Sequence, residues 1–316
     1  MLDPMIQALL DHVPQIGSYA IWEKAPAEAR EDFRRFCQFA SPHDLPIGKV
    51  ENLTAGTIPL RSYTPIAGGT GMLPAIIYFH GGGFVLGDLD SCDALCRTLA
   101  NESNCRIIAV DYRLAPEHPF PAAIEDSFAA VQWVEDHAAE LLVDANHMAV
   151  AGDSAGGNLA ALVCQKAKEN KGAPQIAYQL LIYPVLALSA RPFDGAEAGE
   201  LPEMGFPLDP RALRWFQRYY VPDGVDPADA RLSPLSAGDL SGLPAAYIVT
   251  AGLDPLRDDA ISYAERLKQA GVAAVQIDYP TMIHGFFSMQ GLIPLATEAI
   301  AAAARATQRA LAEGTG

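Results

Sequence analysis

Apolar residues occur along most of this chain in short, nearly continuous runs rather than in strict alternation with polar residues. Six of these runs are rich in β-branched and aromatic residues, which is typical of strands that are covered on both faces of a sheet. The runs occupy residues 73–79, 106–110, 148–151, 177–183, 245–251 and 274–279.

Other stretches place apolar residues three or four positions apart, which predicts amphipathic helices. This spacing in Phe33, Phe36 and Phe39 contributes to the prediction that residues 5–39 are helical. Residues 49–65 alternate between apolar and polar positions and so predict two short strands. The remaining predicted helices cover residues 92–102, 122–139, 155–169, 258–270 and 295–313.

Strands that alternate with helices predict an α/β fold, in which a mostly parallel sheet is covered by helices on both faces. Residues 188–222 interrupt the alternation with prolines, glycines and a helix-like aromatic patch. Because insertions of this length usually serve function, we expect it to fold with the N-terminal helices into a cap over the sheet edge. The expected organisation is cap helices in 1–45, a core in 46–187 and 223–316, and a cap insertion in 188–222.

The composition narrows the class of function. The chain has 316 residues, of which 50% are hydrophobic, and a net charge of −16. Because no cluster of lysine and arginine exists to neutralise phosphates, we expect no nucleic-acid partner. The first residues carry no basic segment and no apolar run is long enough to span a bilayer, so we expect a cytoplasmic protein without stable membrane association.

The five cysteines are an odd count and form no disulfide framework. Cys92 and Cys96 stand about one helical turn apart, but the sequence near them offers no pair of His or Cys to complete a metal site. Buried thiols are therefore expected, and no metal.

The third run leads directly into the pentapeptide Gly-Asp-Ser-Ala-Gly at 152–156. A G-x-S-x-G pattern between a strand and a helix places one serine on a sharp, strained turn above the helix N-terminus, so Ser154 is the candidate nucleophile. Glycine is expected at 152 and 156 for a steric reason, because a side chain at either position would crowd the close approach of strand and helix. Asp153 either tunes the electrostatics of the site or is a polar residue of the turn.

The first run leads into His80 and three consecutive glycines at 81–83. Successive glycines allow the backbone to turn several N–H groups into one hollow, as the stabilisation of a negatively charged oxygen requires. The expected donors are the N–H groups of Gly82, Gly83 and Ala155, and the alternative is an ordinary glycine loop. His80 is expected to brace this loop by hydrogen bonding.

Two further runs end near candidate catalytic side chains. Asp254 follows the run at 245–251 and His284 follows the run at 274–279, so nucleophile, acid and base occur in the chain order of α/β-hydrolases. A serine hydroxyl becomes a strong nucleophile when an imidazole takes its proton, and a carboxylate holds that imidazole in the required tautomer. His284 is therefore the expected base and Asp254 its orienting acid. Asp258 is the alternative acid, although a carboxylate there also suits a helix N-terminus.

Five segments together resemble the bacterial hormone-sensitive-lipase family of esterases and lipases. They are His80-Gly81-Gly82-Gly83, Asp111-Tyr112-Arg113-Leu114-Ala115-Pro116-Glu117, Gly152-Asp153-Ser154-Ala155-Gly156-Gly157, Asp254-Pro255-Leu256-Arg257-Asp258 and His284-Gly285-Phe286. The likeness covers residues 45–316 and implies a capped α/β-hydrolase that cleaves carboxylic esters of short to medium acyl chains and needs no cofactor. It also implies a triad of Ser154, Asp254 and His284.

The resemblance leaves several points open. It implies that Arg113 and Glu117 are architectural, and that a dimer could form through an edge strand, for which 274–279 is the candidate. An amidase, a carbamate hydrolase or a lactonase would use the same residues. A non-catalytic receptor, as in the plant gibberellin receptors, would lack the histidine that His284 supplies. Aromatic or apolar character alone makes the following candidates for the acyl pocket: Phe84, Leu86, Phe206, Trp215 and Tyr219.

Overall fold

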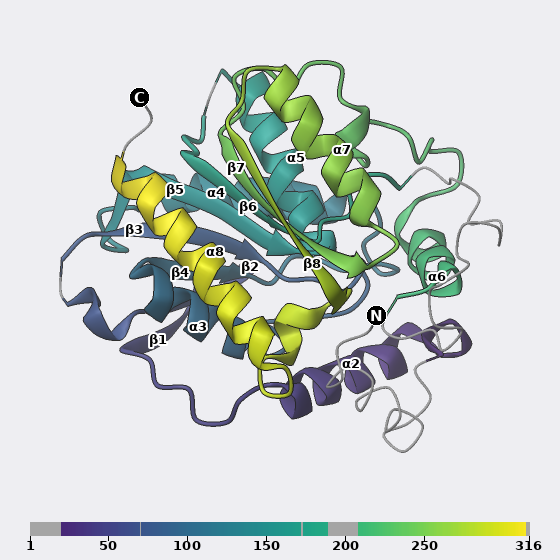
Figure 1. Ribbon diagram of the computed structural model, residues 1–316, viewed down its shortest axis with the longest axis horizontal. Coiled ribbons are helices and arrows are strands. Elements are labelled where there is room, and N and C mark those ends of the chain that lie inside the picture. Colours follow the sequence, from purple (N-terminus) through teal and green to yellow (C-terminus); the bar gives the residue numbers. More distant parts are fainter. Residues whose placement is uncertain (1–19, 70, 172, 189–207, 314–316) are drawn as a thin grey trace.

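The computed structural model describes residues 20–69, 71–171, 173–188 and 208–313. In these residues an eight-stranded sheet has the order β1-β2-β4-β3-β5-β6-β7-β8 (Figure 1). β1 and β2 form an antiparallel hairpin, β2 is antiparallel to β4, and the other neighbours are parallel. The strands are β1 Lys49–Ala55, β2 Ile58–Thr64, β3 Leu73–Phe79, β4 Arg106–Val110, β5 Val143–Asp153, β6 Tyr178–Ile182, β7 Ala245–Leu253 and β8 Ala274–Ile283.

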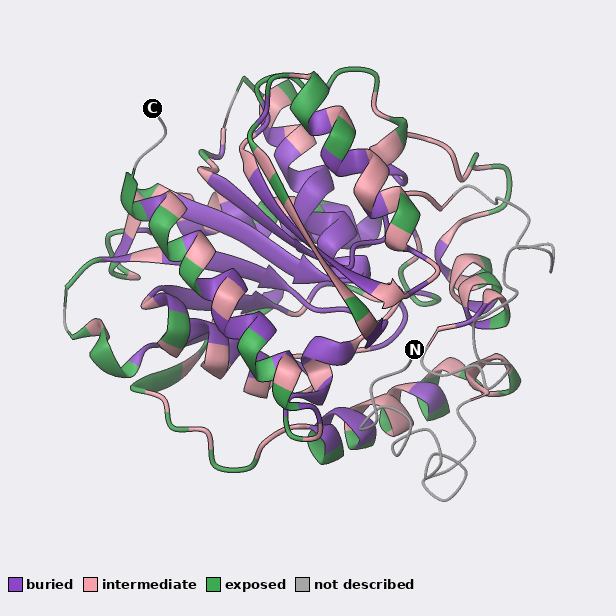
Figure 2. Ribbon diagram, in the orientation of Figure 1, coloured by how far each residue is buried: buried purple, intermediate pink, exposed green. Residues whose placement is uncertain are grey.

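Helices cover both faces of the sheet, as the alternation of strands and helices predicts. Successive side chains of a strand point to opposite faces, so Ile76 and Tyr78 of β3 join one core with α3 and α8, whereas Ile77 and Phe79 join the other with α4, α5 and α7. Figure 2 shows the central strands buried between these layers. The covering helices are α3 Asp93–Ser103, α4 Ala122–Asp136, α5 Ala155–Glu169, α7 Arg257–Gln269 and α8 Pro294–Glu313.

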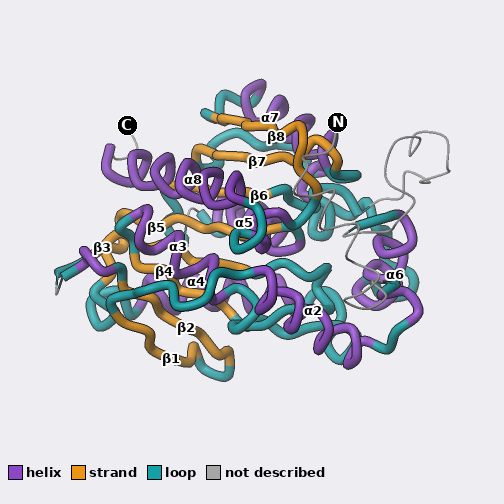
Figure 3. The backbone as a smooth tube through the Cα atoms, turned by 60° about the horizontal axis from the view of Figure 1, so that its bottom comes forward, coloured by secondary structure: helices purple, strands orange, loops and turns teal. Residues whose placement is uncertain are grey.

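Two helices from distant parts of the chain lie together beside this core. They are α2 (Pro26–Ala40) and α6 (Pro210–Tyr220), and Figures 1 and 3 both place them at one end of the molecule. The Trp215 indole of α6 donates a hydrogen bond of 3.3 Å to the Lys24 carbonyl, just before α2. Asp209 caps α6 by accepting from two backbone N–H groups of its first turn, which fixes where the helix begins.

The predicted helix over residues 5–39 is wrong in part. A 3₁₀ turn spans Ile21–Glu23, the chain is extended at Ala25, and α2 begins at Pro26, whose missing N–H suits the first position of a helix. Residues 1–19 lie outside the described part of the chain. Phe39, predicted on the buried face, has 53% of its surface exposed, whereas Phe36 is buried.

The last strand departs from its predicted burial. β8 lies at the edge of the sheet, and most of its residues are partly exposed, because it has a neighbour on one side only. Pairing of two copies through this edge stays a prediction.

Among the described residues, no helix is both long and apolar enough to cross a bilayer.

Candidate active site

The residues singled out in the sequence follow directly on the carboxyl ends of four strands. His80 follows β3, Ser154 follows β5, Asp254 follows β7 and His284 follows β8. These strands are parallel and share one edge of the sheet, where α/β proteins bind their ligands. Side chains up to 204 positions apart in the numbering, from His80 to His284, are thereby gathered at one place.

Ser154 occupies the strained turn that its sequence context predicts. Its backbone has φ +56° and ψ −115°, in a region that non-glycine residues rarely adopt. The two flanking glycines make the turn possible. A Cβ at Gly156 would lie 1.8 Å from the carbonyl oxygen of Phe79, and a Cβ at Gly152 would lie 2.3 Å from the Gly156 backbone. Strand and helix therefore approach closely enough that only glycine fits at these positions.

His284 lies between Ser154 and Asp254. Its Nε2 is 2.9 Å from the Ser154 Oγ, and its Nδ1 is 2.7 Å from the Asp254 Oδ2. With the Nδ1 proton donated to the carboxylate, Nε2 is left to accept the serine proton. The other Asp254 oxygen accepts from the backbone N–H of Leu256 at 2.8 Å. Asp258, the alternative acid, has 78% of its side chain exposed and lies beside Arg257 instead.

The glycine turn, residues 82–84, faces the same space. Gly82, Gly83 and Phe84 all have positive φ, of +118°, +59° and +64°. In the described part of the chain, the N–H groups of Gly82 and Gly83 donate to no other group, and the N–H of Ala155, first residue of α5, has no acceptor within its helix. These donors are therefore available to a ligand.

A buried network holds the glycine turn from behind. Oδ1 of Asp153 accepts from the Tyr78 hydroxyl at 2.6 Å and from the Gly81 N–H at 2.8 Å. Burial raises the pKa of the Asp153 carboxyl, although the Tyr78 hydrogen bond acts to lower it. The His80 Nδ1 donates to the Gly81 carbonyl at 2.8 Å, and the Tyr112 hydroxyl donates to the His80 carbonyl at 2.7 Å. Both Asp153 and His80 thus brace the loop.

A cavity of about 110 Å³ opens at Ser154 and His284. Phe84 and Leu86 line it, whereas Trp215 and Tyr219 are not among its described lining residues. Phe206 lies outside the described residues. Sequence reasoning missed the walls that α2 and α6 contribute, although their apolar spacing could have suggested them. The missed apolar lining residues of these two helices are Phe33, Phe36, Leu213, Phe216 and Tyr220.

The two pairs of α6 aromatics explain that error. Trp215 and Tyr219 are one turn apart on one stripe of the helix, and Phe216 and Tyr220 are one turn apart on the next stripe. Trp215 packs edge-on against Tyr219 at 4.9 Å between ring centroids, while Tyr220 stacks on Phe84 at 3.9 Å. The helical period alone does not say which stripe faces the cavity.

All five cysteines are free and buried. Within the described residues, no group of three or more His, Cys, Asp or Glu side chains is arranged to hold a metal ion. The Cys92 and Cys96 thiols therefore take their place in the apolar interior, and burial raises the pKa of Cys96 well above its ordinary value.

Comparisons with known proteins agree with this geometry. The model of a protein family with the description "alpha/beta hydrolase fold" matches residues 76–288. The chain is 41% identical over 299 residues to the carboxylic ester hydrolase LipN of Mycobacterium tuberculosis, covering 91% of this chain and 77% of that protein. It is 41% identical over 321 residues to the carboxylesterase NlhH of the same organism, covering 98% and 96%. A solved ester-hydrolase from the metagenome of Lake Arreo, complexed with a bipyridine phosphonate derivative, matches with a TM-score of 0.91 at 39% identity, covering 98% of this chain and 99% of that one.

Proposed function

We propose that this chain, which belongs to the hormone-sensitive-lipase family of α/β-hydrolase carboxylesterases, hydrolyses short- to medium-chain carboxylic esters through an acyl-enzyme on Ser154. The observation that carries the proposal is the line of hydrogen bonds from Asp254 through His284 to the Ser154 hydroxyl. In this proposal Ser154 is the nucleophile, His284 the base and Asp254 the orienting acid.

In the first half-reaction Ser154 attacks the ester carbonyl while His284 removes the hydroxyl proton. The carbonyl oxygen gains negative charge and accepts hydrogen bonds from the N–H groups of Gly82, Gly83 and Ala155. Each such donor stabilises the transition state by about 3 kcal/mol. His284 then gives the proton to the departing alcohol, the bond to that alcohol breaks, and the acyl group remains on the serine.

The second half-reaction repeats these steps with water. His284 takes a proton from the water, the resulting hydroxide attacks the acyl carbon, and the same three N–H groups hold the oxyanion. The bond to Ser154 then breaks, the serine regains its proton from His284, and a carboxylic acid leaves. Asp254 stays ionised throughout and stabilises the imidazolium that forms twice in each cycle.

The apolar cavity beside Ser154 supports an acyl substrate. It is lined mainly by apolar side chains from α2, α6 and the loop after β3, and its volume is about 110 Å³. A short acyl chain buried there gains the transfer energy of about 0.8 kcal/mol for each CH₂. The amidase, carbamate hydrolase and lactonase alternatives use the same groups. Ester cleavage is favoured because LipN and NlhH, which match most of the chain, are named as ester hydrolases.

The test is a series of p-nitrophenyl esters from acetate to dodecanoate, assayed with the wild type and with Ser154→Ala. We expect hydrolysis to be greatest for the shorter esters, and Ser154→Ala to fold normally and lose nearly all of it. A fluorophosphonate probe should label the wild type and not the variant, which also separates an enzyme from a non-catalytic receptor. Activity that persists in Ser154→Ala would refute the assignment of the nucleophile.

A further inference from the structure

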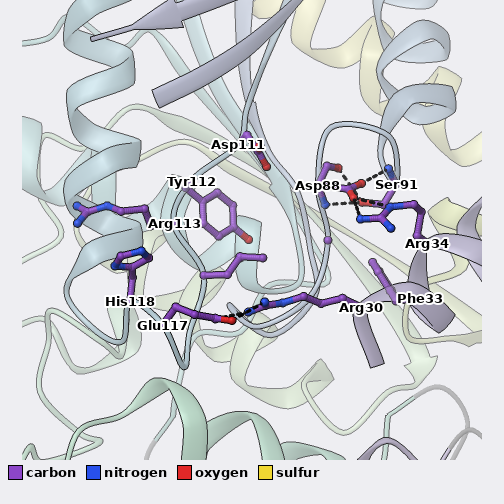
Figure 4. A pocket seen from close by; sticks show the side chains of 12 residues that line it. Arg30, Phe33, Arg34, Asp88, Ser91, Asp111, Tyr112, Arg113, Glu117 and His118 are labelled. Atoms are coloured by element: carbon purple, nitrogen blue, oxygen red, sulfur yellow. Dashed lines mark hydrogen bonds and ion pairs between the residues drawn. The ribbon is translucent and has the colours of Figure 1, made fainter. Parts of the chain in front are cut away.

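Two arginines of α2 bind the segment that follows the glycine turn. Arg30 and Arg34 stand one helical turn apart on the same face of the helix, and Figure 4 shows Arg30 extending to Glu117 and Arg34 extending to Asp88. The Arg34 guanidinium donates to Asp88 at 2.7 Å, and the Asp88 carboxylate in turn accepts from the backbone N–H of Ser91 at 2.8 Å. Helix α2 is thus attached to the loop between β3 and α3.

Arg30 uses its whole guanidinium in this attachment. Its Nε donates to the Val85 carbonyl at 2.7 Å and one terminal nitrogen donates to the Ala115 carbonyl at 2.8 Å. The two terminal nitrogens also form a bidentate pair with the Glu117 carboxylate, at 2.8 and 2.6 Å. These hydrogen bonds lower the pKa of Glu117 to about 2. A planar fork that meets three acceptors at once is geometry that arginine offers and lysine does not.

The acceptors of Arg30 are themselves bonded to the glycine turn. The N–H of Val85 donates to the Gly82 carbonyl at 3.1 Å, and the N–H of Ala115 donates to the Phe84 carbonyl at 2.9 Å. Arg30 is therefore connected to the turn in two ways. It binds the carbonyl of Val85, the residue that follows the turn, and it binds the carbonyl of Ala115, whose N–H donates to the turn residue Phe84. Phe84 is a non-glycine residue with φ +64°, a conformation that persists only where its surroundings fix it, so these outer contacts matter to the position of the turn.

A cavity lies beside the two arginines. The cavity that Figure 4 draws has a volume of about 410 Å³ and separates α2 from the loop after β4. Its lining includes Arg30, Arg34 and Glu117, together with Asp88 and Tyr112. The hydrogen bonds of Arg30 to Ala115 and Glu117 join the helix to the loop beside this space. Phe33, between the two arginines, lines both this cavity and the one at Ser154.

We propose that Arg30 is a positioning residue for ester hydrolysis, which holds the N–H groups of the glycine turn at the place where the oxyanion forms. The proposal rests on the function proposed above. Arg30 does not touch the substrate. Its loss lets Val85 and Ala115 relax, and the N–H groups of Gly82 and Gly83 then point less well at the developing charge.

The experiment compares Arg30→Gln and Arg30→Lys with the wild type at a temperature far below the unfolding transition of each. The substrate is p-nitrophenyl butyrate, and a short alkyl trifluoromethyl ketone, which forms an oxyanion on the serine, is the inhibitor. We expect kcat to fall by about 10- to 100-fold in both variants, with KM within about twofold, because the turn acts on the transition state rather than on the bound ester. The inhibition constant of the ketone should rise by the same factor as kcat falls.

Arg35→Gln is the matched control. Arg35 lies on the same helix, has 66% of its side chain exposed, and forms ion pairs only with Glu31 and Asp32 of α2 among the described residues. Its kcat and inhibition constant should equal those of the wild type. If Arg30→Gln does not fold, Glu117→Gln, which leaves the Val85 and Ala115 bonds in place, should show a smaller fall in kcat with a parallel rise in the inhibition constant.

Each other outcome overturns the proposal. A lower melting temperature with unchanged kcat and ketone inhibition means that Arg30 only stabilises the fold. A raised KM with unchanged kcat means that it sets the wall of the acyl cavity instead of the glycine turn. A wild type that cleaves no ester overturns the proposed function itself. This outcome is distinguishable from failure of the Arg30 proposal because it appears in the wild type alone, without any comparison to the variants.

Discussion

Gly83→Ala tests how closely the glycine turn and helix α6 fit together. A Cβ at Gly83 would lie 2.2 Å from the Phe216 ring, well inside van der Waals contact, and the residue has φ +59°. An alanine at this φ costs about 1–2 kcal/mol. Relief of the overlap costs about 1–3 kcal/mol more, as overpacking usually does. Either the ring of Phe216 or the turn must move.

Movement of the turn displaces the Gly83 N–H from the oxyanion. Loss of one such donor costs about 3 kcal/mol of transition-state stabilisation, so we expect kcat for p-nitrophenyl butyrate to fall by about 10²- to 10³-fold. Phe216→Ala removes the ring that the new methyl would meet. Gly83→Ala should therefore lower kcat much less when it is added to Phe216→Ala than when it is added to the wild type.

Gly56→Ala is the matched control for the backbone. Gly56 lies in the β1–β2 hairpin with φ +63°, and a Cβ there meets nothing within 4 Å. This variant should lose about 1–2 kcal/mol of unfolding free energy in urea titrations and keep its kcat. A Gly83→Ala enzyme with kcat within about threefold of the wild type, or a double variant that recovers nothing, would refute the reasoning.

Two further predictions concern carboxylates. Asp254→Asn should lower kcat by about 10³- to 10⁴-fold in the same ester assay, because the amide holds the wrong His284 tautomer. The kcat of Asp258→Asn should stay within about threefold of the wild type. If Asp258→Asn lowered kcat more than Asp254→Asn, the acid role would move to Asp258. Burial raises the pKa of Asp153 above its ordinary value of 3.8, so ionisation of this group destabilises the fold as pH rises from about 3.8 through the raised folded value, and the cost is absent at lower pH. Asp153→Asn should therefore gain stability relative to the wild type between pH 4 and pH 7 in urea unfolding, and a difference that does not change with pH would contradict this.

The sequence predicts the fold and the gathering of the site because both follow from local patterns. Ser154, Asp254 and His284 each come directly after a strand of a parallel sheet, and parallel strands bring their carboxyl ends to one edge. The hydrogen-bonded line through His284 agrees with that expectation. The two short strands predicted in 49–65 are confirmed as a hairpin.

What the sequence does not predict depends on relative placement of distant elements. The Arg30 pair with Glu117 joins residues 87 positions apart, and no periodicity marks either as the partner of the other. The choice between the Trp215 and Phe216 stripes of α6 is likewise set by where the helix docks. Exposure of Phe39 has the same origin, because α2 docks with Phe36, Cys37 and Ala40 against the core and Phe39 lies outside that buried stripe.

β8 is the last strand of the described chain and lies at an edge of the sheet. This position has a consequence for how ester-hydrolysing activity is lost. His284 is carried on the end of this strand, so the imidazole stays beside the Ser154 hydroxyl only while β8 remains paired with β7. An edge strand held on one side opens more readily than the centre of a sheet. Separation of β8 from β7 would displace the imidazole, so we expect ester turnover to be lost when this edge opens, even while the interior strands remain paired.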